Sequence, residues 1–185
     1  LLFSTVQAQE LAWRLDVTPD SDELRSFRTS WGTFREVENP PTREGLDELR
    51  ISGSGQFGAA GVPVLISRIR ALTDAPIYVV DLRQEDHGFV DGTAVSLHGA
   101  RNQANAGMTA PEAEADEAEM LSSLVGLDFS AVPMGYADTA VMEPFETKVQ
   151  EVQTERALIK GAGLQYVRIA ATDQVWPEPQ AVDAF

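Results

Sequence analysis

A chain of 185 residues, 43% of them apolar, is long enough for one sizeable domain or for a core with a small appendage. Its formal net charge of −15 at pH 7 argues against nucleic acid and anionic membranes as partners, because both repel an acidic surface. The chain has no cysteine, which excludes disulfides, thiolate metal sites and a thiol nucleophile within these residues.

Residues 1–8, LLFSTVQA, have the composition of the end of a secretory signal, with Val6 and Ala8 at the spacing of a cleavage site. An ordinary amphipathic start fits them as well. We expect an exported protein, periplasmic or secreted, with a cytoplasmic protein as the alternative. No apolar run approaches the length of a membrane span. Residues 13–17 then alternate as a strand does, and residues 18–22 break it.

Residues 53–58 fit the glycine fingerprint G-x-G-x-x-G through Gly53, Gly55 and Gly58. A short extended segment precedes them, and a helix that begins near 61–63 follows, with a second strand at 77–80. This order predicts a β-α-β unit with parallel strands. It also makes an NAD(P)-binding oxidoreductase domain an alternative. We interpret the glycines as giving the backbone freedom at a tight turn.

Charged residues crowd the end of the second strand: Asp81, Arg83, Glu85 and His87. One histidine among carboxylates is a poor metal signature, so we expect a charge network that braces the neighbouring loop. Residues 90–95 predict a hairpin with an Asp-Gly turn.

Capping residues define two later helices. Thr109 and Glu112 form a capping box before a helix through about Val125, and Thr154 caps a helix that runs to Lys160. Residues 129–152 predict short strands. Residues 166–170 then predict a buried strand, which Pro177 and Pro179 prevent from continuing.

Asp173 follows that last strand. In open α/β sheets, ligands bind at the carboxyl ends of the strands, so Asp173 is a candidate general acid. A loop aspartate that hydrogen-bonds its own backbone is the other interpretation.

Several strings resemble the protein-tyrosine-phosphatase-like phytases, cysteine phosphatases that act on inositol polyphosphates. Residues 168–177, RIAATDQVWP, resemble the general-acid loop of that family, and residues 76–89 resemble its D-L-R-Q-E-S-H-G string. Further matches are FRTS at 27–30, ISGSGQF at 51–57, and Asp116-Glu117. The resemblance runs from residue 12 to the last residue.

The resemblance implies an α/β fold, with a cysteine-phosphatase-like core whose central parallel sheet is flanked by helices, and a small antiparallel β-barrel subdomain. Residues 27–86 and 154–185 would form the incomplete core. Residues 10–26 and 87–153 would form the barrel and a connecting helix. The H-C-x-x-G-x-x-R-T loop of the family comes after the general-acid loop, so we expect this chain to be truncated.

The same resemblance implies a phosphatase with Asp173 as general acid and Arg28, Asp116, Lys148 and Gln174 as substrate-binding residues, without metal or cofactor. Its partners would be inositol phosphates or other phosphomonoesters and the carboxyl-terminal remainder of the protein. Glu151 and Gln174 depart from the family's basic residue and histidine. A catalytically inactive phosphoinositol-binding or regulatory remnant is a further alternative, and the chain alone is predicted to be inactive.

Overall fold

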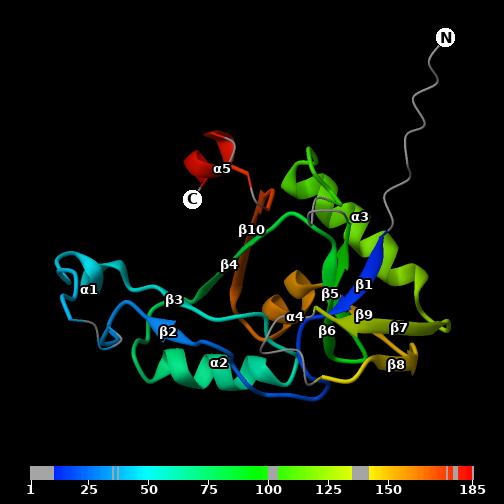
Figure 1. Ribbon diagram of the computed structural model, residues 1–185, viewed down its shortest axis with the longest axis horizontal. Coiled ribbons are helices and arrows are strands. Elements are labelled where there is room, and N and C mark those ends of the chain that lie inside the picture. Colours follow the sequence, from blue (N-terminus) through cyan, green and yellow to red (C-terminus); the bar gives the residue numbers. More distant parts are fainter. Residues whose placement is uncertain are drawn as a thin grey trace, which may run out of the picture.

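The computed structural model describes residues 11–34, 36, 38–99, 104–134, 142–173, 175–176 and 179–184. Its largest sheet has the strand order β8-β7-β1-β6-β5-β9 and curls on one side of the molecule (Figure 1). The strands are β1 (Ala12–Leu15), β5 (His87–Val90), β6 (Thr93–His98), β7 (Asp128–Pro133), β8 (Phe145–Lys148) and β9 (Val152–Gln153).

This curled sheet is mixed, because β1 and β7 pair in parallel while its other neighbours are antiparallel. Among the described residues, no ladder joins the outer strands β8 and β9. The small antiparallel barrel that the sequence suggested is therefore not confirmed, although the strands expected in 129–152 are present.

A second sheet contains β4 (Tyr78–Arg83) and β10 (Gln165–Ala171), which pair in parallel. Val80 lies opposite Val167, and Asp81 lies opposite Arg168. Both strands were predicted from short apolar runs. Their carboxyl ends leave the sheet at the same edge, beside the helix α3 (Ala110–Ser123), which contacts β10 (Figure 1).

The predicted β-α-β unit around the glycine fingerprint was wrong. The strand before it, β3 (Ser52–Gly53), pairs antiparallel with β2 (Arg28–Thr29) and does not join β4. The reason is local: the Gly55 amide donates to the carbonyl oxygen of Arg25 at 2.8 Å, which holds this segment against residues that precede it. The helix α2 (Gly61–Arg70) begins where Pro63 predicted.

None of the three fingerprint glycines has a positive φ, so backbone freedom does not require them, and close packing accounts for two of the three. A Cβ on Gly58 would lie 3.2 Å from the carbonyl oxygen of Ser21, and one on Gly53 would lie 3.3 Å from the Arg28 guanidinium. A side chain at either position would push against its neighbour.

The Asp-Gly hairpin is confirmed between β5 and β6. Asp91 and Gly92 have φ values of 47° and 79°, both positive as a type I′ turn requires. The Asp91 carboxylate also accepts from the backbone amides of Gln150 and Glu151 and from the Thr147 hydroxyl, each at 2.9 Å. One turn residue therefore ties the hairpin to the connection between β8 and β9.

Both predicted helix caps are present. Thr109 and Glu112 form the capping box of α3, and the Thr154 side chain accepts from the Ala157 amide at the start of α4 (Glu155–Gly161). The remaining helices are α1 (Leu46–Leu49) and α5 (Pro179–Ala184). Within the described residues, no helix is both long and apolar enough to span a membrane.

Two apolar clusters fill the interior. The smaller lies inside the curled sheet, around Leu15, Val95 and Phe129. The larger joins α2, α4 and the two-stranded sheet to Phe89 and Ala94 of the hairpin. This larger cluster therefore contains residues from both of the parts that the resemblance implied, the phosphatase-like core and the barrel.

Candidate functional site

The candidate site lies at the carboxyl edge of the β4–β10 pair. β10 ends at Ala171, and Thr172 and Asp173 follow it. Asp173 is exposed, in the position that the sequence predicted. β4 ends at Arg83, so Gln84 leaves the same edge of the sheet.

Gln84 connects this edge to the loop before α3. It is only 2% exposed. The Thr172 hydroxyl donates to Gln84 Oε1 at 2.8 Å, while Gln84 Nε2 donates to the carbonyl oxygens of Asn105 at 2.7 Å and Met108 at 2.9 Å. The residue before Asp173 is therefore joined to the 105–108 loop through one buried amide.

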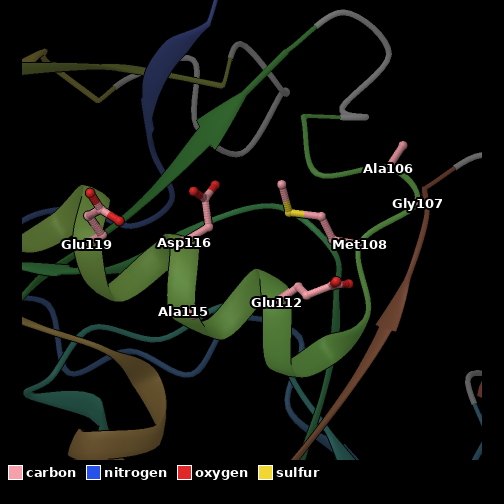
Figure 2. A pocket seen from close by; sticks show the side chains of 7 residues that line it. All are labelled: Ala106, Gly107, Met108, Glu112, Ala115, Asp116 and Glu119. Atoms are coloured by element: carbon pink, nitrogen blue, oxygen red, sulfur yellow. The ribbon is translucent and has the colours of Figure 1, made fainter.

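That loop forms one wall of a pocket, and the first turns of α3 form the other. Figure 2 shows Asp116 and Glu119 projecting from the same side of the helix, with Met108 opposite. The described residues that line the pocket are Ala106, Gly107, Met108, Glu112, Ala115, Asp116 and Glu119. None of these is basic, so the positive pocket expected for a polyanion is not formed by them.

Asn105 fixes the position of Asp116 in the pocket wall. Its Nδ2 donates to Asp86 Oδ1 at 2.9 Å and to Asp116 Oδ2 at 3.3 Å. Asp86 is buried, and this burial, together with the nearby charges of Asp116 and Glu117, raises the pKa of Asp86 to about 7. One amide thus holds two carboxyl groups close together.

Arg168 braces the edge from inside the sheet. Its Nη1 donates to Glu117 Oε2 at 2.6 Å, and its Nη2 donates to the carbonyl oxygen of Glu85 at 2.8 Å. Its Nε donates to the carbonyl oxygen of Arg83 at 3.0 Å. The side chain therefore satisfies the backbone that leaves β4 and attaches it to α3.

His87 lies in the centre of the network, and the polar contacts of its ring among the described residues are all with acceptors. Its Nδ1 is 2.9 Å from the carbonyl oxygen of Glu85 and 3.3 Å from Glu117 Oε2, and its Nε2 is 3.1 Å from Asp81 Oδ2. Burial opposes the charged form of His87, as does Arg83, but the carboxylates of Asp81 and Glu117 outweigh them and raise its pKa. Acceptors at both ring nitrogens and the raised pKa together favour the protonated form of the ring.

The charge network predicted for Asp81, Arg83, Glu85 and His87 is confirmed and is larger than expected. Burial alone would raise the pKa of Asp81, yet hydrogen bonds from His87 and from the Tyr166 hydroxyl hold it well below its usual range. Arg83 pairs with Glu85 at 3.0 Å and with Asp16 at 3.2 Å. Among the described residues, no group of three or more histidine and carboxylate side chains has the arrangement of a metal site.

The other predicted site residues are not brought to this edge. Arg28 is exposed on β2, where its Nη1 donates to the carbonyl oxygen of Ser26 at 3.1 Å, and Lys148 is exposed at the end of β8. β2 and β8 lie on opposite sides of the molecule, away from the start of α3 (Figure 1). Gln174 lies outside the described residues.

Sequence reasoning missed Gln84, Thr172 and Asn105 as parts of the site. Gln84 and Thr172 both lie in strings that resemble a family. The resemblance drew attention to the two segments, but it did not indicate that these two residues form a hydrogen bond. Because 88 positions separate them, no local pattern connects the two. Arg168 and Glu117 were missed for the same reason.

Residues 80–185 match the family model of the PTP-like phytases, whose description reads "Inositol hexakisphosphate". Two structures from Mitsuokella multacida superpose with a TM-score of 0.83 at 37% identity, covering 94% of this chain and 31% of theirs. One is a tandemly repeated protein tyrosine phosphatase-like phytase, and the other is a PTP-like myo-inositol phosphatase in complex with myo-inositol-(1,3,4,5)-tetrakisphosphate.

Two further relatives extend the comparison. A PTP-like phytase from Bdellovibrio bacteriovorus superposes with a TM-score of 0.70 at 28% identity, covering 95% of this chain and 56% of that one. The effector protein hopD2 of Pseudomonas syringae pv. tomato is 32% identical over 142 residues, which are 75% of this chain and 30% of that protein. The α/β fold expected from the sequence is confirmed, and the chain spans about a third of the first of these relatives.

Proposed function

The chain belongs to the protein-tyrosine-phosphatase-like phytase family, and on that premise we propose that it is part of an inositol polyphosphate phosphatase with Asp173 as general acid. The observation that carries the proposal is the position of Asp173, exposed just beyond β10 and joined through Thr172 and Gln84 to a pocket wall. A relative 37% identical to this chain binds an inositol tetrakisphosphate, which supports the substrate class.

In the proposed reaction, a cysteine thiolate outside these 185 residues attacks phosphorus, since the chain itself has no cysteine. A sulfur–phosphorus bond forms as the bond to the inositol oxygen breaks. The Asp173 carboxyl gives its proton to that leaving oxygen, a step that speeds such reactions by about 10²- to 10⁴-fold. Water then attacks phosphorus, the sulfur–phosphorus bond breaks and phosphate is released. The Asp173 carboxylate takes a proton from the water, so the thiolate and the protonated carboxyl are both restored.

An exposed apolar face supports the proposal that the carboxyl-terminal remainder of the protein packs on this chain. On one side of β4, Tyr78 is 63% exposed and Leu82 is 50% exposed, with Val80 and its β10 partner Val167 between them. Parallel strands are normally covered on both faces. A further strand or helices of the same protein would bury this side.

The acidic pocket does not bind a polyphosphate by charge. We assign Asp116 a contact with the free hydroxyls of partly dephosphorylated inositol phosphates, for which a carboxylate is a good acceptor. Arg28 and Lys148 remain the phosphate contacts proposed from the resemblance, and because β2 and β8 lie on opposite sides of the molecule each residue is tested by itself. Arg28→Ala and Lys148→Ala should each raise KM for inositol hexakisphosphate, and an unchanged KM would remove that residue from the binding surface.

The decisive experiment is Asp173→Asn in the full-length encoded protein, assayed for phosphate release. We define the leaving-group ratio as the loss of kcat/KM on inositol hexakisphosphate divided by the loss of kcat/KM on nitrophenyl phosphate, because kcat/KM reports the step in which the leaving group departs and not the later hydrolysis that both substrates share. An alkoxide needs protonation to depart and a nitrophenolate does not, so the ratio should reach about 10²-fold or more. A ratio near one would show that Asp173 is not the general acid. Absence of activity in the unmodified full-length protein would favour the inactive remnant.

A further inference from the structure

The amide of Gln84 has only one possible orientation. One end of it faces the carbonyl oxygens of Asn105 and Met108, which can only accept hydrogen bonds, so that end is the nitrogen. Its two hydrogens are then both in use. The other end is therefore the oxygen, and the Thr172 hydroxyl donates its single hydrogen to it.

This arrangement restrains the residue that precedes Asp173. Thr172 is half-buried, and its hydroxyl is committed to an amide that two backbone carbonyls hold in turn. Gln84 is buried, so loss of any of these partners would leave a polar group without compensation. The backbone at 172 is thus fixed relative to the 105–108 loop.

The same loop positions the pocket wall. The Asn105 side chain donates to Asp116, while the Asn105 carbonyl accepts from Gln84. Gln84 thereby joins the segment that carries Asp173 to the segment that holds Asp116. Loss of the bond from Gln84 to Asn105, or of the bond from Asn105 to Asp116, would remove a link between the carboxyl groups of Asp116 and Asp173.

We propose that Gln84 and Thr172 are positioning residues that set Asp173 relative to the pocket for transfer of its proton. The inference rests on the proposed role of Asp173 as general acid. Neither side chain touches the reacting atoms. Their effect passes through the backbone of Thr172, so it falls on the protonation step and not on the attack at phosphorus.

The first test compares Thr172→Val, which removes the hydroxyl at nearly constant shape, with Thr172→Ser, which keeps it. In the full-length protein, Thr172→Val should lower kcat/KM on inositol hexakisphosphate by about five- to tenfold, the worth of one hydrogen bond. Its loss on nitrophenyl phosphate should be about twofold or less, because that leaving group needs no acid. Thr172→Ser should restore the unmodified leaving-group ratio.

The matched control is Thr147→Val. Thr147 also donates its hydroxyl to a single side-chain oxygen, that of Asp91 at 2.9 Å, but it lies on β8. This variant should leave the leaving-group ratio unchanged. Equal losses on both substrates in Thr172→Val would assign the hydroxyl to stability alone and overturn the proposal.

Gln84→Met provides a second variant if Thr172→Val fails to fold, and it should raise the leaving-group ratio in the same direction. Where both fold, the double variant should lose no more than the larger single loss, because each removes the same hydrogen bond. Fully additive losses of activity in the double variant would show that Gln84 and Thr172 do not act through one shared hydrogen bond. Asp173→Asn is assayed beside these variants. A leaving-group ratio near one in Asp173→Asn would show that Asp173 is not the general acid. A high ratio in Asp173→Asn together with an unchanged ratio in Thr172→Val would reject only the positioning role of Thr172 and Gln84.

Discussion

Arg168 of β10 and Glu117 of α3 form a buried ion pair, with 2.6 Å between Arg168 Nη1 and Glu117 Oε2. Glu117 Oε2 also accepts from the backbone amide of His87 at 3.2 Å. One carboxylate therefore joins α3 to both β10 and β5. Because every partner is buried, the pair cannot be replaced by water when one member is removed.

Glu117→Gln should therefore destabilise the fold by about 3 kcal/mol, since it removes a carboxylate that Arg168 and His87 share and leaves Asp81 beside them. Glu114→Gln is the matched control on the same helix. Glu114 pairs with Arg156 at a partly exposed position, so its loss should cost about 1 kcal/mol or less. Urea unfolding measures both, and similar costs would show that the buried network adds nothing beyond a surface pair.

The contribution of Asp86 to stability should fall as the pH rises from about 4 to 7. Its pKa is about 7 in the fold and near 3.8 when unfolded, so the folded state holds a proton that the unfolded state has lost over this range. The contribution is complete below the unfolded pKa and disappears above the folded one. His87 has a raised pKa and acts in the same direction at higher pH.

Asp86→Asn should remove part of that pH dependence. The amide mimics the protonated carboxyl and does not titrate, so the loss of unfolding free energy between pH 4 and 7 should become smaller. Asp128→Asn, at an exposed position of β7, controls for the change in net charge. A pH profile of Asp86→Asn that matches the unmodified protein would contradict the linkage.

The 185-residue chain by itself should release no phosphate from inositol hexakisphosphate. It has no thiol, and the proposed reaction needs a thiolate to attack phosphorus. Turnover by the purified chain, unaffected by thiol-alkylating reagents, would exclude the cysteine mechanism for it.

Calorimetry with NAD and NADP should show no binding at the glycine fingerprint. The Gln56 side chain within it is already committed, accepting from Arg83 Nη1 at 2.7 Å and donating to Glu155 at 3.0 Å. A dinucleotide would have to displace those bonds. Saturable binding that Gly55→Val abolishes would restore the oxidoreductase alternative.

Local chemistry allowed the sequence to predict many elements of this protein. Thr109 and Thr154 cap their helices, Asp91 and Gly92 make the hairpin turn, and Pro63 marks the start of α2. Each of these caps and turns depends on backbone groups within a few positions of the residue, so a short stretch of sequence is enough to predict it. The apolar run before Asp173 placed it after a strand, and the resemblance added the family.

Only the tertiary structure decided which distant residues meet. The antiparallel pairing of β3 with β2, the Gln84 bond to Thr172 and the Arg168 pair with Glu117 join positions about 25 to 90 apart in the chain. Such contacts form because buried polar groups must find partners wherever the folded backbone brings them. The sequence shows that these polar residues exist, and the packing of β4, β10 and α3 selects their partners.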